Sequence, residues 1–151
     1  MKNKKLTIWL SLVIFISMFF FTQSAFAGLS AKIYFNDGTV QGWENITLPG
    51  YSISSGEGTL LTYKTTSGSE AKIFLPEVEK VIVVKVESNR TLVKFIKDMD
   101  NGKILKNPLN ISGYLDGTEI KASVLAEGRL QEKNISLKKV KFIRLLFVST
   151  D

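Results

Sequence analysis

Short alternating runs of apolar and polar residues fill the chain after Gly28, and turn-forming dipeptides separate them. Alternation of this kind is typical of strands with one buried face, and helical periodicity is hard to find in the same region. The segment Asn36–Thr39 predicts a tight hairpin turn, because its Asp-Gly pair tolerates the positive φ that such turns need. Ser67-Gly68, Asn101-Gly102 and Asp116-Gly117 predict similar turns. We therefore expect an all-β fold.

The alternating runs predict two sets of strands. The first set is Ala31–Asn36, Thr39–Ile46, Thr59–Thr65, Glu70–Leu75 and Lys80–Val86. The second set is Thr91–Lys97, Asn110–Leu115, Glu119–Leu125, Leu130–Ser136 and Val140–Val148. Trp43 follows a glycine on a predicted strand, so we expect it in the core rather than stacked on a sugar.

The first 27 residues are typical of a secretory signal peptide. Three lysines precede an apolar run, Leu6–Phe21, and Ala25 and Ala27 supply the small residues that a signal peptidase reads. We expect cleavage before Gly28 and an exported protein in the periplasm, the cell envelope or the medium. The alternative is an uncleaved membrane anchor, although the run is shorter than most spanning helices. The absence of cysteine excludes a lipid-anchored lipoprotein and favours a bacterial envelope protein.

An internal repeat divides the rest of the chain. The block Ile73–Val81 matches the block Ile135–Ile143 at four apolar positions: Ile73/Ile135, Leu75/Leu137, Val78/Val140 and Val81/Ile143. Each block predicts the end of a strand, one tight turn, a residue that returns to the core and a last strand. Pro76 suits the turn because its φ is fixed. After a signal helix at 1–27, we expect repeats at 28–88 and 89–151, as two tandem small barrel-like units or one fused β-barrel or sandwich.

The segment Lys32–Gly42 resembles the opening strand and hairpin of Sm-like small β-barrels. The closing block of that family, a strand, a short turn and another strand, is similar to Ile73–Val84 and Ile135–Leu146. The resemblance implies a barrel architecture in two divergent copies, although Gly42 comes about one residue early. The RNA site of the family needs an Asp…Asn pair and an Arg-Gly, which are absent from Asn45–Ser55 and Ser67–Ala71. No functional residue is carried over, and we expect no nucleic-acid partner.

Few residues can support catalysis or metal binding. The chain has no histidine and no cysteine, which removes thiol nucleophiles, Ser-His-Asp triads and the commonest metal ligands. Asp98–Gly102 resembles a calcium loop, but its glycine comes one residue early and Leu109 stands where the bidentate Glu belongs, so we interpret it as a polar hairpin turn. Glu77 and Glu79 are a carboxylate pair for which a solvated acidic face is the default interpretation. We expect no enzyme, no catalytic residue, no metal and no cofactor.

Charge separates the two halves of the chain. The net charge of the whole chain is +6, and removal of three signal lysines leaves +3. Residues 28–87 carry five Lys/Arg and seven Asp/Glu, whereas residues 88–151 carry twelve and seven. The candidate face for an anionic partner consists of Lys133, Lys138, Lys139, Lys141 and Arg144. Ordinary solvated strand ends, or lysines that block pairing at a sheet edge, are the alternative.

These observations predict an exported, non-catalytic envelope protein that acts through protein–protein contacts. The alternative is a module that binds an anionic glycan, a lipid headgroup or a cell-wall polymer through the basic C-terminal half. Contact with a membrane is expected only through an uncleaved signal, and self-association stays open.

Overall fold

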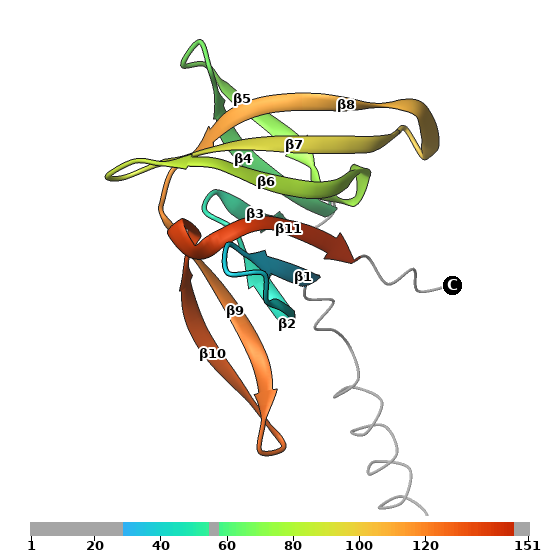
Figure 1. Cartoon of the computed structure of the whole chain (residues 1–151). Helices are drawn as coiled ribbons and strands as arrows, with labels where there is room; N and C mark the ends of the chain where they lie inside the picture. Colours follow the sequence, from blue (N-terminus) through green and yellow to red (C-terminus); the bar gives the residue numbers. More distant parts are fainter. Residues whose placement is uncertain (1–28, 55–57, 147–151) are drawn as a thin grey trace, which may run out of the picture.

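The computed structural model describes residues 29–54 and 58–146, which form eleven strands and two single turns of 3₁₀ helix. The first half contains β1 (Ser30–Phe35), β2 (Val40–Thr47), β3 (Tyr51–Ser54), β4 (Gly58–Thr65), β5 (Glu70–Phe74), η1 (Leu75–Glu77) and β6 (Val78–Val86). The second half contains β7 (Thr91–Asp100), β8 (Lys103–Leu115), β9 (Glu119–Ala126), β10 (Arg129–Ser136), η2 (Leu137–Lys139) and β11 (Val140–Leu146). The all-β expectation is confirmed (Figure 1).

The ten predicted strands all have a counterpart, with shifts of a few residues at their ends. Two strand segments were not predicted, namely β3 and the first half of β8, which begins at Lys103 instead of Asn110. The predicted signal at 1–27, its cleavage site before Gly28 and the end of the last strand at Val148 lie outside the described residues.

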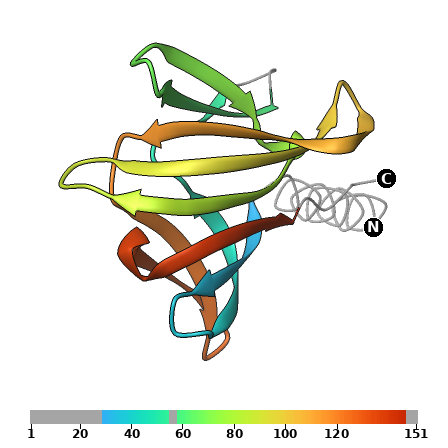
Figure 2. The same cartoon turned by 45° about the horizontal axis from the view of Figure 1, so that its top comes forward.

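The strands of the described residues form one antiparallel sheet with the order β10-β9-β2-β1-β11-β6-β7-β8-β4-β3, and β5 pairs with β4. The order has two ends, at β10 and β3, so strand pairing does not close the sheet into the barrel that the sequence suggested. Figure 2 shows β6, β7 and β8 as long neighbouring ribbons, with β11 next to β6.

Strands from the two halves of the chain are interleaved in this order. β1 and β2 pair with β11 and β9, whereas β4 pairs with β8. The sheet therefore consists of two groups: β3 to β8, which are continuous in sequence, and β1 and β2 with β9, β10 and β11. The groups meet where β6 pairs with β11. The expected boundary between residues 88 and 89 falls between β6 and β7, which are paired neighbours within one group.

The core follows from the alternation of side chains along the central strands. Ile33 of β1, Ile143 of β11 and Val81 of β6 lie directly opposite one another, and each is at most 1% exposed. Their sequence neighbours point to the other face of the sheet, because side chains alternate along a strand. Trp43 is 7% exposed, so its predicted place in the core is confirmed. Burial of apolar side chains of this size stabilises the fold by about 1.5–3 kcal/mol each.

Three of the four predicted hairpin turns are confirmed. Gly38, Gly68 and the pair Asn101-Gly102 connect paired strands, and all four residues have positive φ. Asp116-Gly117 is not a hairpin turn, because it connects β8 with β9, which are not neighbours. A Cβ at Gly117 would lie 3.0 Å from Pro49, so a close approach of two chain segments accounts for this glycine.

The two predicted one-turn connectors are also confirmed. η1 includes Pro76 near its start, and Val78 directly after it is 2% exposed. η2 has the same arrangement, with Leu137 and Val140 in the core. Each connector therefore directs its strand back into the sheet through one buried residue.

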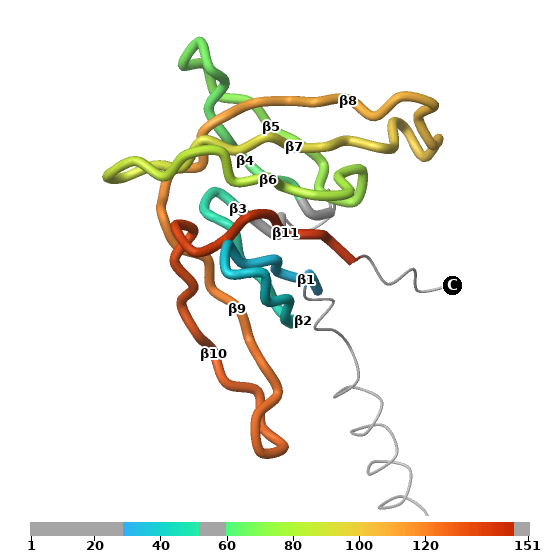
Figure 3. Tube along the Cα trace, viewed as in Figure 1, coloured from blue at the N-terminus to red at the C-terminus, as the bar shows by residue number. Residues whose placement is uncertain are grey.

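Several hairpins extend from the body, as the trace in Figure 3 shows. They include the β7–β8 hairpin and, at the lower end of this view, the β9–β10 hairpin. Within the described residues β10 pairs only with β9, so one of its edges carries unpaired backbone groups.

Candidate binding surfaces

The outer face of the central strands carries a row of cations. Lys32 of β1 lies directly opposite Arg144 of β11, which lies directly opposite Lys80 of β6. Directly opposite residues share a face, and neighbouring strands are about 4.8 Å apart, so the row spans about 10 Å. We call Lys32, Arg144 and Lys80 the cationic row. Glu79 lies 3.7 Å from Arg144 and offsets part of its charge.

A second row, of aromatic and apolar side chains, borders the first. Tyr34, Phe142 and Ile82 lie opposite one another on the same three strands, and Lys94 of β7 continues the row beyond Ile82. The rings of Tyr34 and Phe142 are stacked, with centroids 4.1 Å apart and planes at 17°. The Lys80 ammonium lies 5.5 Å from the centroid of Phe142, a cation–π distance that links the two rows.

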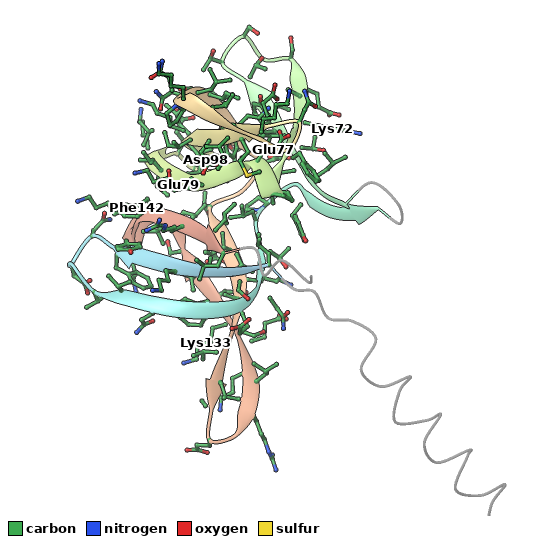
Figure 4. The ribbon with its side chains drawn as sticks, turned by 90° about the vertical axis from the view of Figure 1, so that its right-hand side faces the viewer. Lys72, Glu77, Glu79, Asp98, Lys133 and Phe142 are labelled. Carbon is green, nitrogen blue, oxygen red and sulfur yellow. The ribbon has the colours of Figure 1, made fainter. Side chains whose placement is uncertain are left out.

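The structure brings only part of the predicted basic face together. Arg144 and Lys141 are exposed on β11, where a register shift opposite Tyr34 and Phe35 leaves Lys141 as the additional residue. Lys138 and Lys139 are exposed on η2, and their carbonyl groups accept hydrogen bonds from Asn36. Lys133 is exposed on the β9–β10 hairpin, and Figure 4 shows it far from Phe142. Lys133 therefore belongs to a different surface.

The acidic residues Glu77 and Glu79, which are labelled in the same part of the molecule in Figure 4, have different environments. The side chain of Glu77 is only 14% exposed, so the solvated acidic face expected for it is wrong. Its carboxylate lies 2.9 Å from the Lys97 ammonium and accepts a hydrogen bond from the Asn101 amide at 2.8 Å. Lys97 also contacts Asp100 at 2.7 Å, and these bonds raise its pKa. The cluster fixes the β7–β8 turn to η1.

The β9–β10 hairpin presents exposed leucines. Leu125 and Leu130 lie directly opposite each other and are 68% and 56% exposed. The two-residue turn Glu127-Gly128 has positive φ at both positions, and the pair Ala126–Arg129 closes it. Because closing pairs of such turns are hydrogen-bonded, Leu125 and Leu130 form the next, non-hydrogen-bonded pair, in which side chains approach more closely. β9 pairs with β2 only between Lys121 and Ser123, so the outer half of the hairpin has no third strand.

Two depressions in the described surface are open and shallow. One of about 340 Å³ lies between Leu48, Pro49 and Thr118, and another of about 300 Å³ lies between Val84, Leu137 and Lys138. Residues 29–54 and 58–146 contain no cluster of three acidic residues that could hold a metal ion. In the same residues no helix is long and apolar enough to cross a membrane.

The sequence did not reveal Lys32 and Lys80 as parts of a binding surface. The alternation on β1 and β6 places both on an outer face, and this signal is present in the sequence. Lys32 and Lys80 become neighbours of Arg144, however, only because β11 pairs with both β1 and β6, which are far from it in the sequence. Comparison with protein families, with curated proteins and with solved structures gave no match.

Proposed function

We propose that this is an exported, non-catalytic envelope protein that acts through protein–protein contacts at the β9–β10 hairpin. The exposed pair Leu125–Leu130 carries the proposal. Two opposite leucines on a projecting hairpin leave apolar surface in water, and exposed apolar groups of this kind favour association. A hairpin with only two strands is marginally stable by itself, so a third strand from a partner would stabilise it.

The partner we propose is an extended segment of another protein that adds to β10. Within the described residues, β10 offers one unpaired edge along Arg129–Ser136. Main-chain hydrogen bonds would supply affinity, and an apolar side chain of the partner would pack against Leu130. Such a contact depends little on salt, because burial of apolar surface and main-chain bonding are not screened.

Site-specific photo-cross-linking tests this proposal in the native envelope. A photoreactive amino acid replaces Leu130, and a second version carries it at Ile104, which is 83% exposed on the β7–β8 hairpin. We expect one cross-linked protein from position 130, retained at high salt and absent when Leu125→Ser accompanies the probe at position 130. Equal capture from positions 104 and 130, or no capture at 130, would contradict the proposal.

Export itself is part of the proposal and has its own test. The lysines, the apolar run and the Ala25-Phe26-Ala27 segment support cleavage before Gly28. Mass spectrometry of the protein purified from the envelope should give a chain that starts at Gly28. A full-length mass would establish an uncleaved anchor instead.

We further propose that the two halves derive from one duplicated unit whose strands are exchanged. The matched blocks carry η1 and η2 at corresponding positions, and Leu75, Leu137, Val78 and Val140 are all at most 2% exposed. β1 and β2 of the first half pair with β11 and β9 of the second, and β7 and β8 of the second pair with β6 and β4 of the first. This reciprocal pairing supports an exchange between two similar units.

A further inference from the structure

We infer that the cationic row, with Lys94 beside it, is a binding site for a linear acidic polysaccharide with one carboxylate on each sugar. The inference concerns the outer face of β1, β11 and β6, which is separate from the β9–β10 hairpin. It does not depend on the protein partner proposed above, and its test uses different residues.

The position of the cations excludes the usual structural reason for lysines on strands. Lysines at sheet edges block unwanted pairing with other chains. Lys32, Arg144 and Lys80 lie on interior strands, because β1 pairs with β2 and β11, β11 with β1 and β6, and β6 with β11 and β7. Protection of an edge therefore does not account for the cationic row.

The row also has an energetic cost in the free protein. Like charges directly opposite each other on neighbouring strands destabilise the sheet. Lys32–Arg144 and Arg144–Lys80 are both such pairs, and the contact with Glu79 offsets only one of the three charges. An anionic ligand would remove this repulsion, so binding and stability are coupled at this face.

The geometry of the aromatic pair disfavours two other classes of ligand, nucleic acids and lipid bilayers. The rings of Tyr34 and Phe142 stack on each other and the Lys80 ammonium lies over the Phe142 ring, so part of the ring surface that a nucleic-acid base would need is already occupied. Tyr34, Phe142 and Ile82 are only partly exposed on a sheet face, so they offer no projecting apolar group for insertion into a bilayer. A ligand recognised by its charges fits this face better than either.

The spacing of the row sets the charge density that a ligand must offer. Neighbouring cations are about one strand separation apart, about 4.8 Å. A polymer of uronic acids carries one carboxylate on every sugar, so it offers an anionic group at each step along its chain. Because the ammonium groups of Lys32 and Lys80 sit on flexible stems, they can reach carboxylates that point in different directions.

Binding to polygalacturonate, an available polymer of this class, tests the inference. The double variant Lys32→Gln/Lys80→Gln is compared with Lys121→Gln/Lys133→Gln, which removes the same charge from exposed positions on β9 and β10. We expect the first variant to weaken binding at least tenfold and to reduce its dependence on salt, and the second to change binding less than threefold. Polygalacturonate should also raise the melting temperature of the natural protein but not of the first variant.

The remaining outcomes would overturn the inference. Equal weakening in both variants would show that only net charge matters, and absence of binding would exclude the site. Anionic lipid vesicles and a single-stranded oligonucleotide serve as competing probes. Stronger binding of either probe, lost in Lys32→Gln/Lys80→Gln, would assign the face to a membrane or to nucleic acid. Because the leucines of the hairpin are unchanged in both variants, cross-linking at position 130 tests the protein partner separately.

Discussion

Val81 of β6 lies directly opposite Ile143 of β11, at the junction between the two groups of strands. In the duplication that we propose, these two residues correspond to each other. The same correspondence maps the adjoining pair Ile82–Phe142 onto the pair Lys80–Arg144. On that proposal the strand pair would have a local twofold relation around Val81 and Ile143, and the cation–π contact of Lys80 with Phe142 would join two corresponding positions.

The first prediction concerns this junction. Val81 and Ile143 are 0% and 1% exposed, so Val81→Ala should cost about 1–3 kcal/mol and Ile143→Ala about 2–5 kcal/mol of unfolding free energy. The double variant should depart from additivity, because the side chains are neighbours. Urea denaturation measures all three values. Ile104→Ala, at an 83% exposed position, is the control and should change stability by less than about 0.5 kcal/mol.

Because strands from the two halves of the chain are interleaved, we expect that neither half folds by itself. A fragment that ends at residue 88 contains β1 and β2 without β11 and β9, and contains β4 without β8. Neither 28–88 nor 89–151 should give dispersed amide signals in NMR spectra, whereas the two fragments together should restore the spectrum of the whole chain. An independently folded 28–88 fragment would contradict the strand order.

The sequence predicted local structure well and strand partners poorly. Ten strands and both connectors follow from alternation, and three predicted hairpin turns follow from glycine positions. β3 was missed because Pro49 and Gly50 precede a serine-rich segment, and the first half of β8 was missed because Asn107 and Pro108 interrupt its pattern. Pairing of β1 with β11 depends on contacts across most of the chain, which alternation within each strand cannot specify.

The basic face was predicted incompletely for the same reason, because strand partners could not be read from the sequence. Arg144 and Lys141 were predicted to belong to a basic face because they cluster in the sequence. Lys32 and Lys80, in contrast, become neighbours of Arg144 only through strand pairing. Lys133 belongs to the same sequence cluster, yet the direction of the β9–β10 hairpin carries it away. Proximity in sequence was therefore a poor guide to proximity on the surface.

A glycine on β8 should be essential for the pairing of β8 with β4. Gly113 lies opposite Thr65, and a Cβ there would collide with the ring of Tyr63 and lie 2.9 Å from the carbonyl oxygen of Lys64. Gly113→Ala should therefore cost about 1–3 kcal/mol by overpacking. Gly42→Ala is the matched control, because a Cβ at Gly42 meets nothing within 4 Å. Thermal denaturation of the two variants should separate them clearly, and equal melting temperatures would contradict this account.

Alkaline pH should break the ion pairs of Lys97 with Glu77 and Asp100, because Lys97 loses its charge. Hydrogen bonds to Asp100 and Glu77 raise the pKa of Lys97 in the folded protein. The ion pairs thus stabilise the fold fully below the ordinary lysine pKa of about 10.4, and this contribution is lost as pH rises through the raised value. Lys97→Met should lower stability at pH 7, and its difference from the natural protein should shrink in strongly alkaline solution. Urea midpoints at several pH values measure the effect, and a constant difference would contradict it.

Two proline substitutions distinguish the free edge of β10 from its paired edge. Hydrogen-bonded pairs alternate from Ala126–Arg129, so the Gln131 amide bonds to β9, whereas the Glu132 amide points to the unpaired edge. Gln131→Pro removes a ladder bond and should lower the melting temperature, since proline has no amide hydrogen. Glu132→Pro leaves the ladder intact and should change the melting temperature less, yet it should abolish cross-linking from position 130. If cross-linking survives Glu132→Pro, the partner contacts the leucines without adding a strand, and the edge has no part in binding.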